Sequence, residues 1–116
     1  MVNLKRIYDP VGDHDGERIL VDRLWPRGVS RQAAALDSWN KAVAPSPELR
    51  QWFGHQPERF EEFRRKYLAE LAHNEAAQQL QQDARHRTLT LLYAAKDPLH
   101  NHARVLQEFL TRTEAR

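Results

Sequence analysis

The sequence predicts a small α/β domain, and three observations lead to that prediction. Residues 88–95, TLTLLYAA, are apolar on much of both faces of a strand, which is typical of a central strand covered by helices. Residues 57–72 carry apolar side chains at helical spacing. Shorter strand-like segments nearer the N-terminus are separated by turn formers. We expect one compact domain over residues 1–116, with a small, mostly parallel or mixed β-sheet and helices packed on both faces.

Two strands are expected before the first helix, at residues 4–8 and 18–24. Only about nine residues join them, whereas a parallel crossover usually needs a dozen or more. We therefore expect an antiparallel pair, with Asp15 and Gly16 in the turn.

The middle of the chain shows clear helix signals. Ser30 is a candidate N-cap for a short helix through RQAAAL, and residues 38–44 alternate as a strand would. Ser46 and Pro47 begin a further helix, which Gly54 ends. Two more helices are expected, over residues 57–72 and 75–84.

The C-terminal strand leads into a last helix. Asp97 followed by Pro98 matches an N-cap with proline at the first helical position. Apolar residues continue at helical spacing as Leu99, Ala103, Leu106 and Leu110.

Composition narrows the class of protein. The 18 basic and 16 acidic residues leave a net charge of +2, which is too small to favour nucleic-acid binding by itself. There is no cysteine, which excludes disulfides, thiolate catalysis and cysteine-bound zinc. No apolar run is long enough to cross a membrane, and the N-terminus lacks a signal-peptide core. We expect a cytoplasmic protein without a membrane partner.

Polar residues cluster where two strands end. If these strands are parallel neighbours in one sheet, their loops share the edge at which α/β sheets bind ligands. A helix N-terminus together with cationic side chains attracts anions there, so we expect a small phosphate- or carboxylate-bearing ligand. The candidate ligand-binding residues are Asp22, Arg23, Trp25, Arg27, Gly28, Lys96 and Asn101.

General acid–base chemistry is the second expectation for this edge. His102 and His100 are the candidate catalytic residues, with Asp97 or Asp22 orienting an imidazole. Each polar group also has a structural interpretation, as an ion pair, a helix cap or a hydrogen bond to a carbonyl. The two histidines are spaced i,i+2 and do not share a helix face, so we predict no metal and no cofactor.

Other functions stay open at this point. The chain has no G-x-S-x-G elbow, no G-x-G-x-x-G and no P-loop. A non-enzymatic interaction or nucleic-acid-binding module is one alternative, and a His/Asp metal-dependent hydrolase is another. The sequence does not determine the reaction, the substrate or the oligomeric state.

Several motifs together resemble one known family. The stretches DGERILVDRLWPRGVSR, APSPELRQWFGH and TLLYAAKDPLHNHARVL are similar to the YeaO-like family of small bacterial proteins, a branch of a larger domain-of-unknown-function family. The resemblance implies a cytoplasmic α/β protein without an established activity. Larger relatives carry a Cys-His-Arg string where this chain has LHNHAR, so Leu99, His100 or Asn101 replaces the thiol. The resemblance therefore implies no thiol mechanism here.

Overall fold

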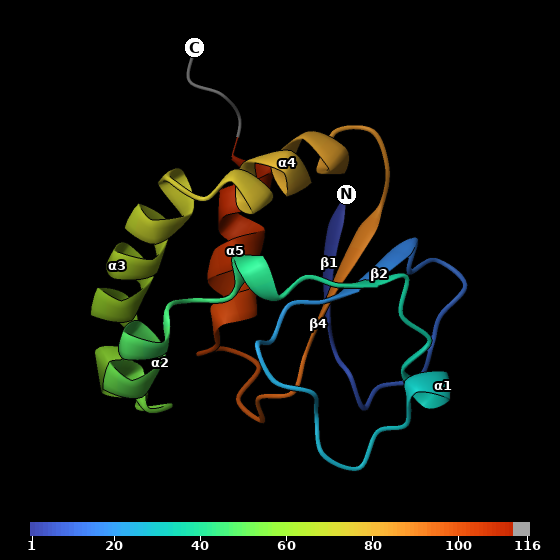
Figure 1. Cartoon of the computed structure of the whole chain (residues 1–116), viewed down its shortest axis with the longest axis horizontal. Helices are drawn as coiled ribbons and strands as arrows, with labels where there is room; N and C mark the ends of the chain where they lie inside the picture. The colour runs from blue at the N-terminus through green and yellow to red at the C-terminus, as the bar shows by residue number, and fades with distance from the viewer. Residues whose placement is uncertain (113–116) are drawn as a thin grey trace.

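A four-stranded, fully parallel sheet forms the centre of the molecule, with strand order β1-β4-β2-β3 (Figure 1). The computed structural model describes residues 1–112. The strands are β1 (Val2–Arg6), β2 (Glu17–Leu20), β3 (Ser38–Trp39) and β4 (Leu89–Tyr93). All five residues of β4 are buried, and β4 pairs with both β1 and β2. The prediction of a central strand here is confirmed.

The predicted antiparallel pairing of the first two strands is wrong. β1 and β2 do not pair with each other, because β4 lies between them and runs parallel to both. Residues 7–16 connect β1 to β2 without a helix. A chain of that length reaches roughly 33 Å when extended. That reach covers the return along a short strand and two strand spacings of about 4.8 Å each. A parallel crossover usually needs a dozen or more residues. Fewer are enough here because β2 is only 4 residues long, so the connection has a short distance to return.

Helices cover the two faces of the sheet unequally (Figure 1). Helix α5 packs on β1 and β4, and α3 and α4 pack against α5 in turn. Within residues 1–112, the opposite face carries only the short α1 and the loops beside it (Figure 1). The helices are α1 (Arg31–Ala34), α2 (Pro47–Phe53), α3 (Phe60–Ala72), α4 (Glu75–Ala84) and α5 (His102–Thr111), with 3-10 turns at Lys41–Val43 and Pro57–Arg59.

Strand alternation divides the core into two clusters. Leu89, Leu91 and Tyr93 of β4 face the large helical layer. Leu92 faces the other side, where it meets Leu20 in a smaller cluster. The α/β class with helices on both faces is thus confirmed. None of the helices within residues 1–112 is long and apolar enough to span a membrane.

Most predicted helix ends are confirmed, and two predictions need correction. The Ser30 and Ser46 side chains accept hydrogen bonds from Ala33 N and Leu49 N, as N-caps do. Residues 38–44 form a strand only at Ser38–Trp39 and then a 3-10 turn. The last helix is capped by Asn101, not Asp97, because Asn101 Oδ1 accepts from Arg104 N at 3.0 Å.

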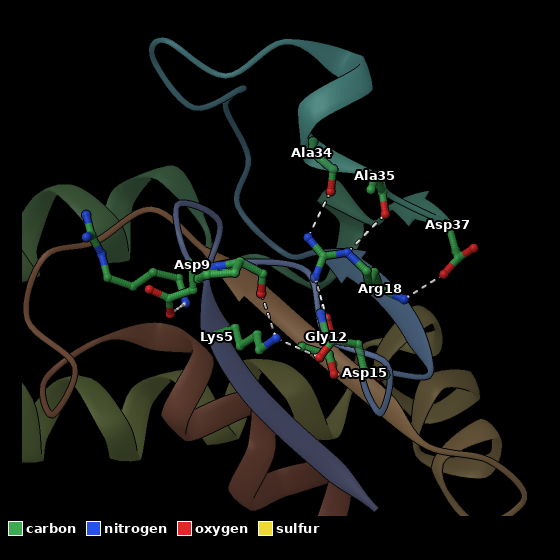
Figure 2. Close-up of polar contacts among 11 residues, drawn as sticks. Lys5, Asp9, Gly12, Asp15, Arg18, Ala34, Ala35 and Asp37 are labelled. Carbon is green, nitrogen blue, oxygen red and sulfur yellow. Dashed lines mark hydrogen bonds and ion pairs between the residues drawn. The ribbon is translucent and has the colours of Figure 1, made fainter.

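A buried ion cluster secures the sparsely covered face (Figure 2). Asp15 lies between Lys5 of β1, at 2.8 Å, and Arg18 of β2, at 2.6 Å. Arg18 also donates hydrogen bonds to the carbonyls of Ala34 and Ala35 at the end of α1. From the sequence, Asp15 was expected in a turn, and the ion cluster was not predicted. The Asp15 carboxylate thus joins β1 to β2, and Arg18 extends the cluster to the end of α1.

Candidate ligand-binding cleft

The carboxyl ends of β2 and β4 lie side by side, as a shared site between the loops that follow them requires. Leu20 is in register with Leu92, and Val21 N donates to the Leu92 carbonyl at 3.1 Å. One residue further on, Ala94 N donates to Asp22 Oδ2 at 3.0 Å. The loops that follow the two strands are therefore joined at one edge of the sheet. This is the edge at which open α/β sheets bind ligands.

A cleft of about 520 Å³ opens at this edge. Its size falls within the usual range for small-molecule sites, roughly 300–1,000 Å³. Six residues that the sequence analysis singled out line it: Asp22, Arg23, Lys96, Asp97, Asn101 and His102. The facing wall comes from α2, its flanking residues and α3, and consists of Ala44, Pro45, Arg50, Phe53, His55 and Phe63. Leu24, Ala94 and Ala95 complete the lining.

The cations of the cleft have no acidic partners among residues 1–112. Arg50 and Lys96 are exposed and form no hydrogen bond or ion pair through their side chains with the described part of the chain. Arg23 donates from Nη2 to the Pro45 carbonyl at 3.1 Å, while its buried Nε has no hydrogen-bond partner within that part. A buried donor without a partner is costly unless a ligand or water satisfies it.

The two carboxylates of the cleft, by contrast, are already engaged. Asp97 accepts hydrogen bonds from the backbone N–H groups of Leu99 and His100, and its Oδ2 lies 2.8 Å from His100 Nδ1. The bond from Leu99 N is the main cause that lowers the pKa of Asp97 below its usual value. Asp22 is held by Ala94 N and faces His102. Among the described residues, the unpartnered groups of the cleft are therefore mainly cationic, and the one carboxylate oxygen without a hydrogen bond is Asp22 Oδ1, which faces His102.

His102 begins α5 and contacts two acceptors through the same ring nitrogen. Nε2 lies 3.2 Å from the Val21 carbonyl and 3.1 Å from Asp22 Oδ1. The hydrogen-bond geometry favours the carbonyl, so Asp22 Oδ1 is left in close contact but without an aligned hydrogen bond. Nδ1 has no partner within the described residues.

We predict that neutral His102 carries its proton on Nε2, because both atoms facing Nε2 are acceptors. Long-range ¹H–¹⁵N NMR of the imidazole rings at alkaline pH measures the tautomer directly. His14, which is exposed, serves as the internal reference and should show a mixture of tautomers. A dominant Nδ1–H form of His102 would contradict the geometry.

Tyr67 is buried next to His102 and does not belong to the lining of the cleft. It is 1% exposed, its hydroxyl donates to the Val43 carbonyl, and its ring centroid lies 6.4 Å from that of His102. Burial raises the pKa of Tyr67 above its usual value, and the charges of Glu70 and Asp22 raise it further. Tyr67 is therefore a neutral hydrogen-bond donor that fixes the residues before α2.

Four of the predicted site residues lie outside the lining of the cleft. Trp25 packs in the smaller core cluster, and its Nε1 donates to the Val29 carbonyl at 2.7 Å. Arg27 and Gly28 are exposed on the same loop, and the Arg27 carbonyl accepts from the Tyr8 hydroxyl. His100 pairs with Asp97, and its ring meets Phe60 edge-on at 5.3 Å.

The sequence analysis missed the α2 side of the cleft, above all Arg50 and Phe53. Both belong to a helix whose ends were predicted correctly, but no pattern linked that helix to the sheet edge. The link is tertiary: Arg23 donates a hydrogen bond to the Pro45 carbonyl just before α2, and α2 packs against α3. From the sequence, Arg50 and Phe53 were expected only as part of this helix, with Phe53 as a packing residue, and not as part of a binding site.

The metal-hydrolase alternative lacks a ligand set. Within residues 1–112, no group of three or more His, Cys, Asp or Glu side chains could hold a metal ion. Asp22 and His102 form a pair only.

These features define a parallel α/β domain with a cationic cleft at the carboxyl edge of its sheet. The model of the family described as "Inactive DUF488-N3 subclade" matches residues 1–116, and the chain belongs to that family. It is 48% identical over 110 residues to the uncharacterised protein YeaO of Escherichia coli strain K12, covering 94% of this chain and 96% of that protein. It is 39% identical over 109 residues to the uncharacterised protein Rv3073c of Mycobacterium tuberculosis strain H37Rv, covering 94% and 92%. No solved structure shows significant similarity to the chain.

Proposed function

We propose that the cleft binds a small ligand that carries an anionic group, and that Arg23 and Lys96 hold this group. The observation that carries the proposal is the imbalance of partners in the cleft. Each carboxylate accepts at least one hydrogen bond from the protein, and only Asp22 Oδ1, which faces His102, accepts none, whereas Arg23 Nε and the whole Lys96 ammonium have no acceptor among residues 1–112. The N-terminus of α5, at Asn101, adds partial positive charge to the same wall.

Binding is favoured over turnover for two reasons. The family is described as an inactive subclade, and the chain contains no cysteine that could act as a nucleophile. The acid–base role of His102, His100 and Asp97 stays a prediction, and so does the cytoplasmic location. Nucleic-acid binding usually requires many basic side chains that contact phosphates. The cleft carries only a few charged groups, so it does not support the alternative of a nucleic-acid-binding module.

Anion titrations monitored by NMR test the proposal. Acetate and inorganic phosphate should shift the Arg23 Nε–H resonance and the backbone amides of residues 94–96, because these groups line the cleft. Lys96→Gln and Arg23→Gln should each weaken this binding by about tenfold, the usual cost of one charge-assisted hydrogen bond. Lys96 is exposed, so its replacement leaves the fold intact.

Arg87→Gln is the matched control. Arg87 also loses one positive charge on replacement, but it pairs with Glu17 at the amino end of β2, away from the cleft. Its substitution should leave the titration unchanged. If Lys96→Gln and Arg87→Gln had equal effects, the binding would be a general response to net charge and the proposal would fail.

A further inference from the structure

We infer that the ligand of this cleft is an amphipathic monoanion: a carboxylate attached to a flat or branched apolar body. The inference rests on the proposed function and adds the class of ligand. Three properties of the cleft lead to it, namely its charge, its size and the apolar surface at its rim.

Charge limits the head group to a single negative charge. Three permanent cations, Arg23, Arg50 and Lys96, line the cleft together with two carboxylates, Asp22 and Asp97. With neutral histidines this leaves one net positive charge. A second negative charge on the ligand would face these carboxylates without compensation. A carboxylate therefore suits the cleft better than a phosphate dianion.

Size requires a body beyond the head group. A carboxylate or an inorganic ion fills only a small part of a cleft of about 520 Å³. The remaining wall is largely apolar and includes Phe53 and Phe63, whose rings stack with centroids 4.4 Å apart. Water against such a wall is readily displaced by an apolar group.

The rim carries an apolar side chain that the protein itself does not cover. Leu24 lines the cleft and is 62% exposed, although it directly follows Arg23. An apolar group attached to a carboxylate at Arg23 would reach Leu24 and remove it from water. Because the exposed Leu24 lies next to the charged end of the cleft, the cleft suits an amphipathic ligand better than a purely ionic one.

Calorimetric titrations with a graded series of probes test the inference. Affinity should rise at least about tenfold from acetate to 2-naphthylacetate, because the naphthyl group buries apolar surface. The neutral isostere 2-naphthylacetamide should bind at least about tenfold more weakly than 2-naphthylacetate, because it lacks the charge that Arg23 and Lys96 require.

Two leucine variants of similar exposure supply the internal control. Leu24→Ala should weaken 2-naphthylacetate about fivefold and leave acetate unchanged, as expected for a partly buried apolar contact. Leu99 is 59% exposed and lies outside the lining of the cleft, so Leu99→Ala should change neither titration. Both side chains are exposed, so neither variant threatens the fold.

The outcomes separate this inference from the proposed function. Equal binding of acetate and 2-naphthylacetate, with Lys96→Gln still weakening both, would overturn the amphipathic ligand and leave anion binding in place. Equal binding of the acid and the amide would overturn the role of charge and with it the proposed function. No binding of any anion would overturn both.

Discussion

Replacing Asp15 by asparagine is expected to lower the free energy of unfolding by about 3 kcal/mol, the usual cost of breaking a buried ion pair from one side. Asp15 is 6% exposed and Arg18 is 4% exposed, so the guanidinium that remains cannot be rehydrated in place. Asparagine also sets its amide N–H₂ against either the Lys5 ammonium or the Arg18 guanidinium, both of which are donors. Urea unfolding measures the change.

Glu61→Gln is the control for this substitution. Glu61 also pairs with an arginine three residues away, Arg64, but its side chain is 76% exposed. Such a pair contributes less than about 1 kcal/mol, so its loss should scarcely change unfolding. A similar change for Asp15→Asn and Glu61→Gln would show that the cluster does not stabilise the fold.

The same cluster predicts a pH dependence with a definite sign. Hydrogen bonds from Lys5 and then from Gly12 N lower the pKa of Asp15 from 3.8 to about 2. Because the folded state holds the carboxylate ionised, the stabilisation is complete above the unfolded pKa and disappears as pH falls through the folded one. The difference in stability between the wild type and Asp15→Asn should therefore shrink between about pH 4 and pH 2.

Local signals predicted most of the fold. The caps at Ser30 and Ser46 act between residues three apart, and the alternation of β4 reports burial on both faces. Such features depend only on neighbouring residues, which a single sequence displays. The prediction of strand direction failed because loop length was the only clue. The position of β4 between β1 and β2 depends on pairing between residues 72 positions apart for β2, as Glu17 with Leu89, and 87 apart for β1, as Val2 with Leu89.

The C-terminal cap shows how two local signals can compete. Asp97 with Pro98 and Asn101 with His102 both match a helix start, and the structure uses the second. Asn101 is 1% exposed and donates to the Asp97 carbonyl, so the extra turn between them is itself closed by hydrogen bonds. Asp97 is thereby free to face the cleft and pair with His100.

The candidate site was predicted on the sheet side and missed on the helix side. Asp22, Arg23, Lys96 and His102 follow strands, and the ends of parallel strands meet by geometry alone. Arg50 and Phe53 reach the cleft through the packing of α2 against α3, which no spacing in the sequence encodes. The buried Lys5–Asp15–Arg18 cluster was missed for the same reason, since its charges alone look like surface residues.

Replacing Gly16 by alanine is expected to be as damaging as losing the ion cluster, and Gly28→Ala provides its matched control. Both glycines have left-handed backbones, with φ of 66° and 75°. A Cβ on Gly16 would lie 2.3 Å from the Thr88 carbonyl oxygen, whereas a Cβ on Gly28 meets nothing within 4 Å. Only Gly16 thus combines backbone strain with a steric clash.

The clash falls where the sheet can least accommodate it. The Thr88 carbonyl accepts the hydrogen bond from Glu17 N at 3.0 Å that begins the pairing of β2 with β4. Gly28→Ala should cost about 1–2 kcal/mol, from the left-handed backbone alone. Gly16→Ala should cost at least about twice as much, because the backbone at the start of β2 must also move. Urea unfolding of both variants measures the difference, and equal losses would show that the approach of Gly16 to Thr88 is not a constraint on the fold.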